Sequence, residues 1–282
     1  MDESVRKRPR GRPKSLFKEP QGGTVQALDR GLALLEDLAN RGSATLADLS
    51  LRNGLAASTA HRILATLAQH GFVEIDDRSQ QWSVGMEAFR IGSHYLTRMN
   101  VVEASRSAMR ELMEATGETS NLGISDNGDV VFVSQVESHN PIRAFFRPGT
   151  RGYMHCSGIG KALLSVLDTE SVKRILRKKG LPEFTEKTLT NPDALFSNLE
   201  NAKQRGWALD DEERYLGMRC VAAPIFNAFG EAIAGISVSG PAVRFPDEEV
   251  EEIGPLVRRA ANDVTKSIGG TPGGKRKDAS NR

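Results

Sequence analysis

Apolar residues recur every three or four positions in the first part of the chain, a spacing that predicts amphipathic helices. The first helix is expected to begin after a cap at Thr24 and to end at Arg41 and Gly42. Its apolar stripe is expected to pack in a core behind later helices. The stripe consists of Val25, Leu28, Leu32, Leu35 and Leu38.

Two shorter helices follow, with a glycine between them. Residues 45–53 are predicted to form one, with Thr45 as its N-cap. Residues 55–70 are predicted to form the other, which ends at Gly71. Gly54 supplies the tight turn between them. Two short helices joined by such a turn are typical of a helix-turn-helix motif, which lays its second helix in the major groove of DNA.

Polar and apolar residues alternate after this motif, which predicts a β-hairpin. Residues 72–76 form its first strand, residues 77–80 its turn and residues 81–84 its second strand. A hairpin at this place corresponds to the wing of a winged helix, so residues 21–85 are expected to bind DNA. The alternative is a helical hairpin that belongs to another fold.

A helical pattern over residues 86–116 leads out of this region, with a weak point at Asn100. Residues 86–100 are expected to link the first domain to a second one. Their apolar face suits two roles, mechanical coupling of the domains or a dimer surface, and the sequence does not separate these roles.

Residues 101–268 are expected to form a mixed second domain. Strands are predicted at 120–125, 130–136, 142–146, 219–226 and 233–239, and helices at 158–166, 171–178, 192–205 and 247–266. The turn Asp126-Asn-Gly-Asp129 is a strong hairpin signal. Adjacent strand pairs with helices between later strands predict an α+β domain, an antiparallel sheet flanked by helices. Residues 269–282 are rich in Gly and Lys and are expected to be a disordered tail.

The composition is typical of a globular protein of about two domains, with 282 residues, 39% hydrophobic and 26% charged. No apolar run approaches the ~18 residues that a membrane span needs, and no hydrophobic segment follows the basic N-terminus. Neither Cys156 nor Cys220 has Cys or His at the spacing of a zinc site. We therefore expect a cytoplasmic protein with reduced thiols, no metal, no cofactor and no contact with a membrane.

The charge is unevenly distributed along the chain. Residues 1–20 carry a net charge of +4 and residues 271–282 carry +3, whereas residues 21–270 between them carry −5. Within the predicted DNA-binding domain, residues 21–84 have five Arg against seven acids. Affinity for DNA would therefore depend on a few well-placed Arg residues and on the basic arm.

The basic arm, residues 1–20, contains Arg10-Gly-Arg-Pro13, which is similar to an AT-hook. Gly11 lets the backbone lie deep in a minor groove, Pro13 keeps the chain extended, and Arg10 and Arg12 follow the negative potential of A·T-rich DNA. The alternative is a disordered basic tail that only attracts phosphates loosely.

The third helix carries the candidate base contacts. Small hydroxyl donors, an imidazole and one guanidinium crowd its first turns, where side chains reach base edges in the major groove. With the cap of the preceding helix, the candidate DNA-binding residues are Thr45, Ser58, Thr59, His61 and Arg62.

Five blocks of the sequence, in order, resemble the IclR family of bacterial transcription regulators over about residues 22–268. The blocks are Ser58-Thr-Ala-His-Arg62, Met154-His-Cys-Ser-Gly-Ile-Gly-Lys-Ala162, Gly206-Trp-Ala-Leu-Asp-Asp-Glu-Glu213, Gly217-Met-Arg-Cys220 and Ile236-Ser-Val-Ser-Gly-Pro241. The resemblance implies a winged helix-turn-helix joined by a long helix to a GAF-like effector-binding domain. It also implies a homodimer or homotetramer on a palindromic operator, with regulation of either sign. Within the family, the blocks are most similar to the branch that responds to glyoxylate and pyruvate.

The chemistry of the second domain suits a small anionic effector. Ser157-Gly-Ile-Gly160 opens a helix, where backbone N–H groups can receive a carboxylate. Ser237 and Ser239 lie two positions apart on a strand and so face the same side. Cys220 begins a strand that can lie beside them, and Asp210 stands at the end of another strand.

The family resemblance also implies a set of ligand contacts. In relatives that bind glyoxylate, the ligand is held by an Asp, a Cys, two Ser and two backbone amides. The corresponding positions in this chain are Asp210, Cys220, Ser237, Ser239, Gly158 and Ile159. Apolar walls are expected from Phe145, Met154 and Met218. Relatives often have Ala at the position of Ile159, so the pocket is expected to be tighter. Glyoxylate or a similarly small 2-oxo acid is the expected effector, and larger aromatic acids are expected to be excluded.

Several other functions suit parts of the sequence. Asp210 can cap a loop or pair with Arg214, and a Cys or Ser on a buried strand is often structural. A redox sensor or enzyme can use Cys220 as a reactive thiol, or His155 as a base beside Cys156. An architectural protein of A·T-rich DNA can depend mainly on the arm. No catalytic residue is expected, because no third orienting group accompanies the His and Cys.

Overall fold

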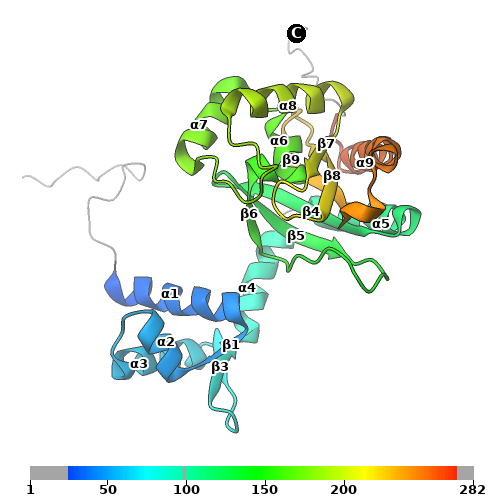
Figure 1. Cartoon of the computed structure of the whole chain (residues 1–282). Coiled ribbons are helices and arrows are strands. Elements are labelled where there is room, and N and C mark those ends of the chain that lie inside the picture. Colours follow the sequence, from blue (N-terminus) through cyan, green and yellow to red (C-terminus); the bar gives the residue numbers. More distant parts are fainter. Residues whose placement is uncertain (1–24, 98–99, 272–282) are drawn as a thin grey trace, which may run out of the picture. The chain divides into compact units, whose positions relative to one another are not determined.

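The computed structural model describes residues 25–97 and 100–271 of the chain. Thr24, the expected helix cap, therefore lies outside the described residues, as do Arg10 and Arg12 of the basic arm. The chain divides into two compact units, one up to His94 and one from Tyr95 onward (Figure 1). Each unit has a hydrophobic core of its own.

Residues 26–97 form four helices and a three-stranded sheet. In chain order the elements are α1 (Gln26–Arg41), β1 (Ser43–Thr45), α2 (Leu46–Arg52), α3 (Ala57–Gln69), β2 (Val73–Ile75), β3 (Gln81–Val84) and α4 (Met86–Thr97). The strands pair antiparallel in the order β1-β3-β2. The predicted helix-turn-helix and its hairpin are confirmed. Strand β1 was not predicted, because three residues carry too short a pattern.

Local chemistry sets the ends of α2 and α3. The Thr45 hydroxyl accepts the backbone N–H three residues on, at 3.2 Å, so the predicted cap of α2 is confirmed. Gly54 has φ +61° in the turn, a conformation that favours glycine. Helix α3 begins at Ala57 instead of Leu55, because the Leu55 N–H donates to the carbonyl of Ser50 within the turn.

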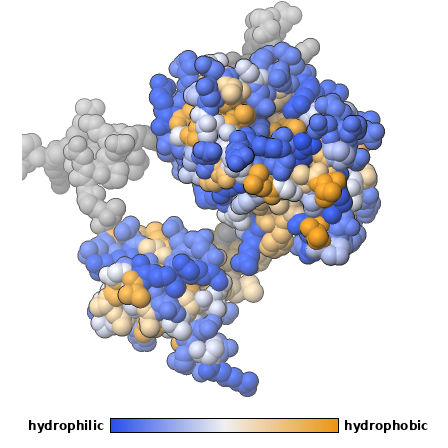
Figure 2. Space-filling view, in the orientation of Figure 1, coloured by the Kyte–Doolittle hydropathy of each residue, from blue (hydrophilic) through white to orange (hydrophobic). Residues whose placement is uncertain are grey.

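The buried face of α1 overlaps only in part with the predicted one. Val25, Leu28 and Leu32 are 69%, 62% and 52% exposed, so the prediction that they form core is wrong. The prediction is confirmed for Leu38, which is buried, and for Leu35, which packs against the core; the helix also buries Gly31 and Leu34. On the face drawn in Figure 2, apolar patches interrupt a mainly hydrophilic surface. Helix α1 is apolar on two faces, and periodicity alone does not tell which of them packs inward.

The long helical pattern over residues 86–116 appears as two helices. Helix α4 ends at Thr97 and α5 (Asn100–Thr116) begins at Asn100, the predicted weak point; residues 98–99 lie outside the described part of the chain. In α5, Met109 and Leu112 pack into the core of the second unit.

The second unit is built on a six-stranded antiparallel sheet in the order β6-β5-β4-β9-β8-β7. Its strands are β4 (Thr119–Asp126), β5 (Asp129–Val136), β6 (Arg151–Tyr153), β7 (Ala208–Asp211), β8 (Met218–Phe226) and β9 (Ala232–Pro241). Asn127 and Gly128 both have positive φ in the turn between β4 and β5, which confirms the predicted hairpin. The predicted antiparallel α+β sheet is confirmed.

Helices cover both faces of this sheet (Figure 1). Helices α5 and α9 (Asp247–Ser267) pack on one face. The other face is covered by α6 (Gly158–Leu164), α7 (Thr169–Lys179) and α8 (Pro192–Arg205), with a short 3-10 turn at Met154–Cys156 before α6. A second 3-10 turn, Ala242–Arg244, follows β9. The functional side chains described below lie on the α6 face.

The predicted strand over residues 142–146 is wrong, because this segment has no ladder hydrogen bonds. Side chains satisfy its carbonyls instead. Thr119 Oγ1 donates to the Ala144 oxygen at 2.9 Å, and Arg244 Nη2 donates to the Ile142 oxygen at 2.8 Å. The segment is thus fixed as an irregular loop that leads into β6.

Candidate functional site

Three adjacent strands bring three polar side chains side by side. Asp210 on β7 pairs with Cys220 on β8, which in turn pairs with Ser239 on β9. Side chains on a strand alternate between faces, so these three point to the same face of the sheet. Ser237 lies two residues along β9 on that face, opposite Ala222. Its hydroxyl is buried, and no partner is found for it among the described residues.

The start of α6 lies directly on this row. Ser157 caps the helix and accepts the Gly160 N–H at 3.4 Å. A Cβ at Gly158 would lie 2.7 Å from Cys220 Sγ, so only glycine allows the helix to approach the strand this closely. Gly160 is equally restricted, since a Cβ there would lie 2.3 Å from the Met154 carbonyl oxygen.

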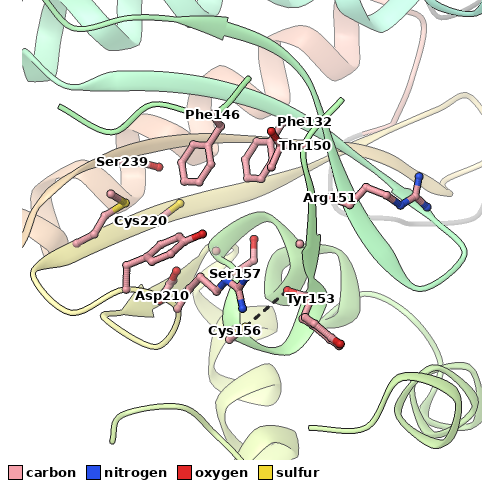
Figure 3. Close-up of a pocket in the computed structure, with 15 residues that line it drawn as sticks. Phe132, Phe146, Thr150, Arg151, Tyr153, Cys156, Ser157, Asp210, Cys220 and Ser239 are labelled. Atoms are coloured by element: carbon pink, nitrogen blue, oxygen red, sulfur yellow. Dashed lines mark hydrogen bonds between the residues drawn. The ribbon is translucent and has the colours of Figure 1, made fainter. Parts of the chain in front are cut away.

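A small cavity lies between this row and a wall of aromatic rings (Figure 3). Phe132 and Phe146 stack with centroids 4.4 Å apart and close one side. The interior volume is about 40 Å³, whereas one water needs about 10–15 Å³ by this measure. The cavity therefore suits a molecule of a few non-hydrogen atoms. Its lining consists of Phe132, Phe146, Thr150, Arg151, Gly152, Tyr153, Cys156, Ser157, Gly158, Asp210, Arg214, Tyr215, Met218, Cys220 and Ser239.

Asp210 is the buried acid of the cavity. Burial raises its pKa to about 7, and the negative charge of Glu213 raises it further, whereas Lys161 opposes the shift. Asp210 Oδ1 accepts the Glu213 N–H at 2.9 Å. The capping role considered for Asp210 is thus observed, while the ion pair considered with Arg214 is absent from the described residues. Lys161 and Glu213 form a buried ion pair of their own.

Both cysteines are protonated thiols at neutral pH. Burial raises the pKa of Cys220 to about 11 and that of Cys156 to about 12. His155 is not paired with Cys156; its Nε2 lies 3.1 Å from the Pro182 carbonyl, and burial lowers its pKa. This arrangement counts against a nucleophilic or redox-active thiol, because the thiolate is the reactive form.

The structure brings most of the predicted effector residues together. Gly158, Asp210, Met218, Cys220 and Ser239 line the cavity. Ser237 lies next to this set, fully buried.

Three other predicted pocket residues are placed differently. Phe145 is half exposed and lines an adjoining outer groove with Phe146, Arg147, Thr150, Tyr215 and Met218. Met154 is not a pocket wall, because it is buried in the core below α6. The Ile159 side chain points at Gly123 and Gly235 of the sheet, so the prediction that it narrows the pocket is wrong. Ile159 is not among the residues that line the cavity, and the contact through its backbone amide stays a prediction.

Sequence reasoning missed the aromatic wall and the rim. Phe132 lies on a strand that was predicted, but Phe146 comes from the segment predicted wrongly as a strand. Arg214 and Tyr215 follow the Asp210 block directly, and their place beside it was the available signal.

The candidate DNA-contacting residues lie mainly on one exposed face of α3. Ser58, His61 and Arg62 are exposed, and Thr59 is half-buried. Thr45 is occupied as the cap of α2, and its hydroxyl also donates to Asp48 Oδ2 at 2.7 Å. The face presented by α3 is therefore polar and open, as a recognition helix requires.

The arginines of this unit differ in their ion pairs. Asp37 holds Arg41 and Arg52, each at 2.9 Å. Arg62 on α3 and Arg78 in the hairpin turn have no acidic partner within residues 25–97. Arg78 was missed in the sequence, although its place at the tip of the predicted hairpin was visible. These two guanidinium groups are free to meet phosphates or bases.

Within residues 25–97 and 100–271, no group of His, Cys, Asp and Glu can hold a metal ion. No helix in these ranges has the length and apolar character needed to cross a membrane.

Comparison with known proteins matches both units. Residues 27–77 match the IclR helix-turn-helix domain, and residues 93–266 match the C-terminal part of the bacterial transcriptional regulator IclR. The chain is 49% identical to the HTH-type transcriptional regulator BhcR of Paracoccus denitrificans (strain Pd 1222), with both chains fully covered. It is 40% identical to the transcriptional repressor IclR of Escherichia coli (strain K12), covering 93% of this chain and 96% of the relative. The crystal structure of the Thermotoga maritima IclR superposes with a TM-score of 0.74 at 28% identity, covering 87% of this chain and all of that one.

Proposed function

The chain belongs to the IclR family of bacterial transcriptional regulators, and we propose that its second unit binds glyoxylate or a similarly small 2-oxo acid. The relatives are transcriptional regulators, not enzymes, and the chain is a ligand-responsive DNA-binding regulator of this type. The proposal concerns the effector, the residues that hold it and the assembly that binds DNA.

The cavity beside Asp210, Cys220 and Ser239 carries this proposal. Its interior of about 40 Å³ suits glyoxylate, which has five non-hydrogen atoms. An aromatic acid would have to displace the stacked rings of Phe132 and Phe146. Size alone therefore favours a two- or three-carbon acid.

Polar groups around the cavity suit a carboxylate and a neighbouring oxo group. A buried carboxylate is costly unless donors compensate its lost hydration. The Ser239 hydroxyl, the Cys220 thiol and the backbone amides of Gly158 and Ile159 are the donors we assign. Ser237 adds a buried hydroxyl with no partner among the described residues. Asp210, when protonated, donates a hydrogen bond to an oxo oxygen instead of repelling the anion.

For the first unit, we infer that α3 enters the major groove with Ser58, Thr59, His61 and Arg62 toward base edges. We assign the hairpin, with Arg78 at its turn, to the adjacent sugar-phosphate backbone of the DNA. The resemblance of the sequence blocks implies that family members bind palindromic operators as homodimers or homotetramers. We propose the same assembly for this chain. The helices over residues 86–116 are the path by which effector binding alters operator affinity.

Titration calorimetry with glyoxylate, pyruvate and benzoate tests the effector. We expect heat with glyoxylate or pyruvate and none with benzoate. Ser239→Ala is expected to weaken binding about 3- to 10-fold, as expected when one hydrogen bond is removed. Ser107→Ala, on the exposed side of α5, serves as the matched control. Binding of benzoate without binding of either 2-oxo acid would contradict the proposal.

A mobility-shift experiment on the DNA upstream of the neighbouring genes tests the regulatory role. We expect a shifted band whose midpoint moves when glyoxylate is added at saturation. A midpoint that stays constant, while calorimetry detects binding, would show that the acid is not the regulating effector.

A further inference from the structure

Arg214 is a cation at the cavity to which the described residues supply no hydrogen-bond acceptor. It lines the cavity, and its Nη1 is buried with no hydrogen-bond partner in the part of the chain that the structure describes. The other arginine of the lining, Arg151, is occupied by Asp126 at 2.5 Å and by Asp129 at 3.4 Å. Lys161, nearby, is paired with Glu213. Arg214 thus differs from both other cations around the site.

Aromatic rings hold the guanidinium of Arg214 in place. Its Cζ lies 3.7 Å from the ring centroid of Phe184 and 5.3 Å from that of Tyr215. Stacking of this kind fixes the plane of the guanidinium while leaving its N–H groups free at the edge. The donors at this edge are therefore available to a ligand.

The backbone that carries Arg214 is also fixed. Thr185 Oγ1 donates to the Glu212 carbonyl at 2.7 Å, and Thr188 Oγ1 donates to the Glu213 carbonyl at 2.6 Å. Glu212 has φ +60°, a conformation held by these contacts. A side chain that starts from such a support loses little further freedom when it binds.

A buried N–H group without an acceptor destabilises the protein by the full cost of its desolvation. No hydrogen bond or ion pair joins Arg214 to either nearby acid among the described residues. Asp210 Oδ1 accepts the Glu213 N–H, Glu213 Oε1 binds Lys161, and Glu213 Oε2 is itself buried without a partner there. An anion in the cavity would supply the missing acceptor. A planar guanidinium can bind a carboxylate through two parallel hydrogen bonds.

We propose that Arg214 binds the carboxylate of the effector and makes the cavity selective for small anions. This inference rests on the proposed function and adds a residue to it that the family resemblance did not imply. Arg214 joins the donors already assigned to the carboxylate, which leaves the oxo group for Asp210.

Calorimetry on the full-length protein with glyoxylate and pyruvate tests this assignment. Arg214→Gln keeps hydrogen-bonding capacity and removes the charge; we expect it to weaken binding about 10- to 100-fold, the effect of removing a charged hydrogen bond. Arg214→Lys is expected to be intermediate, because it keeps the charge but not the planar pair of donors. Arg174→Gln, on the exposed side of α7, makes the same change in net charge away from the site and is expected to bind within twofold of the wild type.

The outcomes separate the two proposals. If the wild-type protein binds either acid and Arg214→Gln binds it with the same affinity, the role of Arg214 is overturned and the effector proposal stays intact. Absence of binding by the wild-type protein to either acid overturns the effector proposal and this inference together. Circular dichroism and operator binding without effector report folding of the variant. If Arg214→Gln does not fold, Phe184→Leu, which removes the surface under the guanidinium, is expected to weaken binding at least threefold, and unchanged affinity overturns the inference.

Discussion

Asp210 is a carboxyl group whose protonated, uncharged form is favoured in the folded protein. Its pKa rises from 3.8 to about 7 on burial beside Glu213. Between these two pH values the unfolded chain releases this proton and the folded protein retains it, so stability contributed by Asp210 falls as pH rises. Asp210→Asn, which cannot ionise, is expected to equal the wild type near pH 4. It is expected to be more stable by up to about 4 kcal/mol at pH 8.

Urea unfolding at pH 5, 6, 7 and 8 measures this difference. The gap between variant and wild type should widen with pH up to about 7 and then remain level. Asp263→Asn, an exposed acid on α9, is the control for a change of one charge. A gap that stays constant across the range, or that narrows as pH rises, would be inconsistent with a neutral Asp210.

The residues of the candidate site were predictable only where regular structure carries them. Alternation along a strand puts Ser237 and Ser239 on one face, and strand pairing then places Asp210 and Cys220 beside them. The opposite wall was not predictable in this way. Phe146 arrives on an irregular segment whose conformation depends on side chains from distant parts of the chain, and no local pattern encodes such interactions.

At the scale of elements, most helices and strands follow from periodicity, whereas the buried face of a helix does not. The apolar spacing correctly predicts helix α1 and the burial of Leu38, but it wrongly places the exposed Val25, Leu28 and Leu32 in the core. Gly31 marks the side that packs, since a Cβ there would lie 3.5 Å from Ile63 of α3. Which of two apolar stripes is buried depends on the partner helix, and that information lies outside the helix itself.

Helix α3 is expected to contribute specificity through Arg62. Arg62→Ala is predicted to weaken operator binding by about 1–3 kcal/mol if the guanidinium binds a base edge. Binding to unrelated DNA would then change little, because base contacts add only to the specific complex. Fluorescence anisotropy with operator and scrambled duplexes measures both affinities.

Arg41→Ala provides the comparison for Arg62→Ala, since Arg41 is held by Asp37 on the same unit. We expect a change of less than about threefold for this variant, the small effect typical of an exposed ion pair. Equal weakening by Arg62→Ala on operator and scrambled DNA would assign Arg62 to phosphate instead of to a base.

At the scale of the whole molecule, charge and specificity lie in different parts of the chain. Residues 1–20 carry a net charge of +4, whereas residues 21–84 carry −2. Deletion of residues 1–20 is expected to lower affinity for all DNA and to make that affinity less sensitive to salt. The slope of log affinity against log salt concentration should become shallower by about 0.9 for each phosphate that the arm neutralises. Preference for the operator should survive. If that preference disappears, the arm, and not α3, selects the site, as in an architectural protein of A·T-rich DNA.

Coupling between the two units has a thermodynamic signature that does not depend on how they are arranged. If glyoxylate binds the second unit and changes operator affinity by some factor, then operator DNA must change glyoxylate affinity by the same factor. Coupling of this kind typically amounts to about 5- to 150-fold. The two factors can be measured separately, by anisotropy at saturating glyoxylate and by calorimetry on the preformed operator complex. Unequal factors would mean that glyoxylate also alters the oligomer, because the simple linkage holds only when the assembly stays the same.

The Arg214→Gln variant should show the same coupling factor as the wild type once glyoxylate is saturating. It should need a higher glyoxylate concentration to reach saturation, because Arg214 is assigned to binding the effector and not to coupling the effector site to the DNA-binding unit.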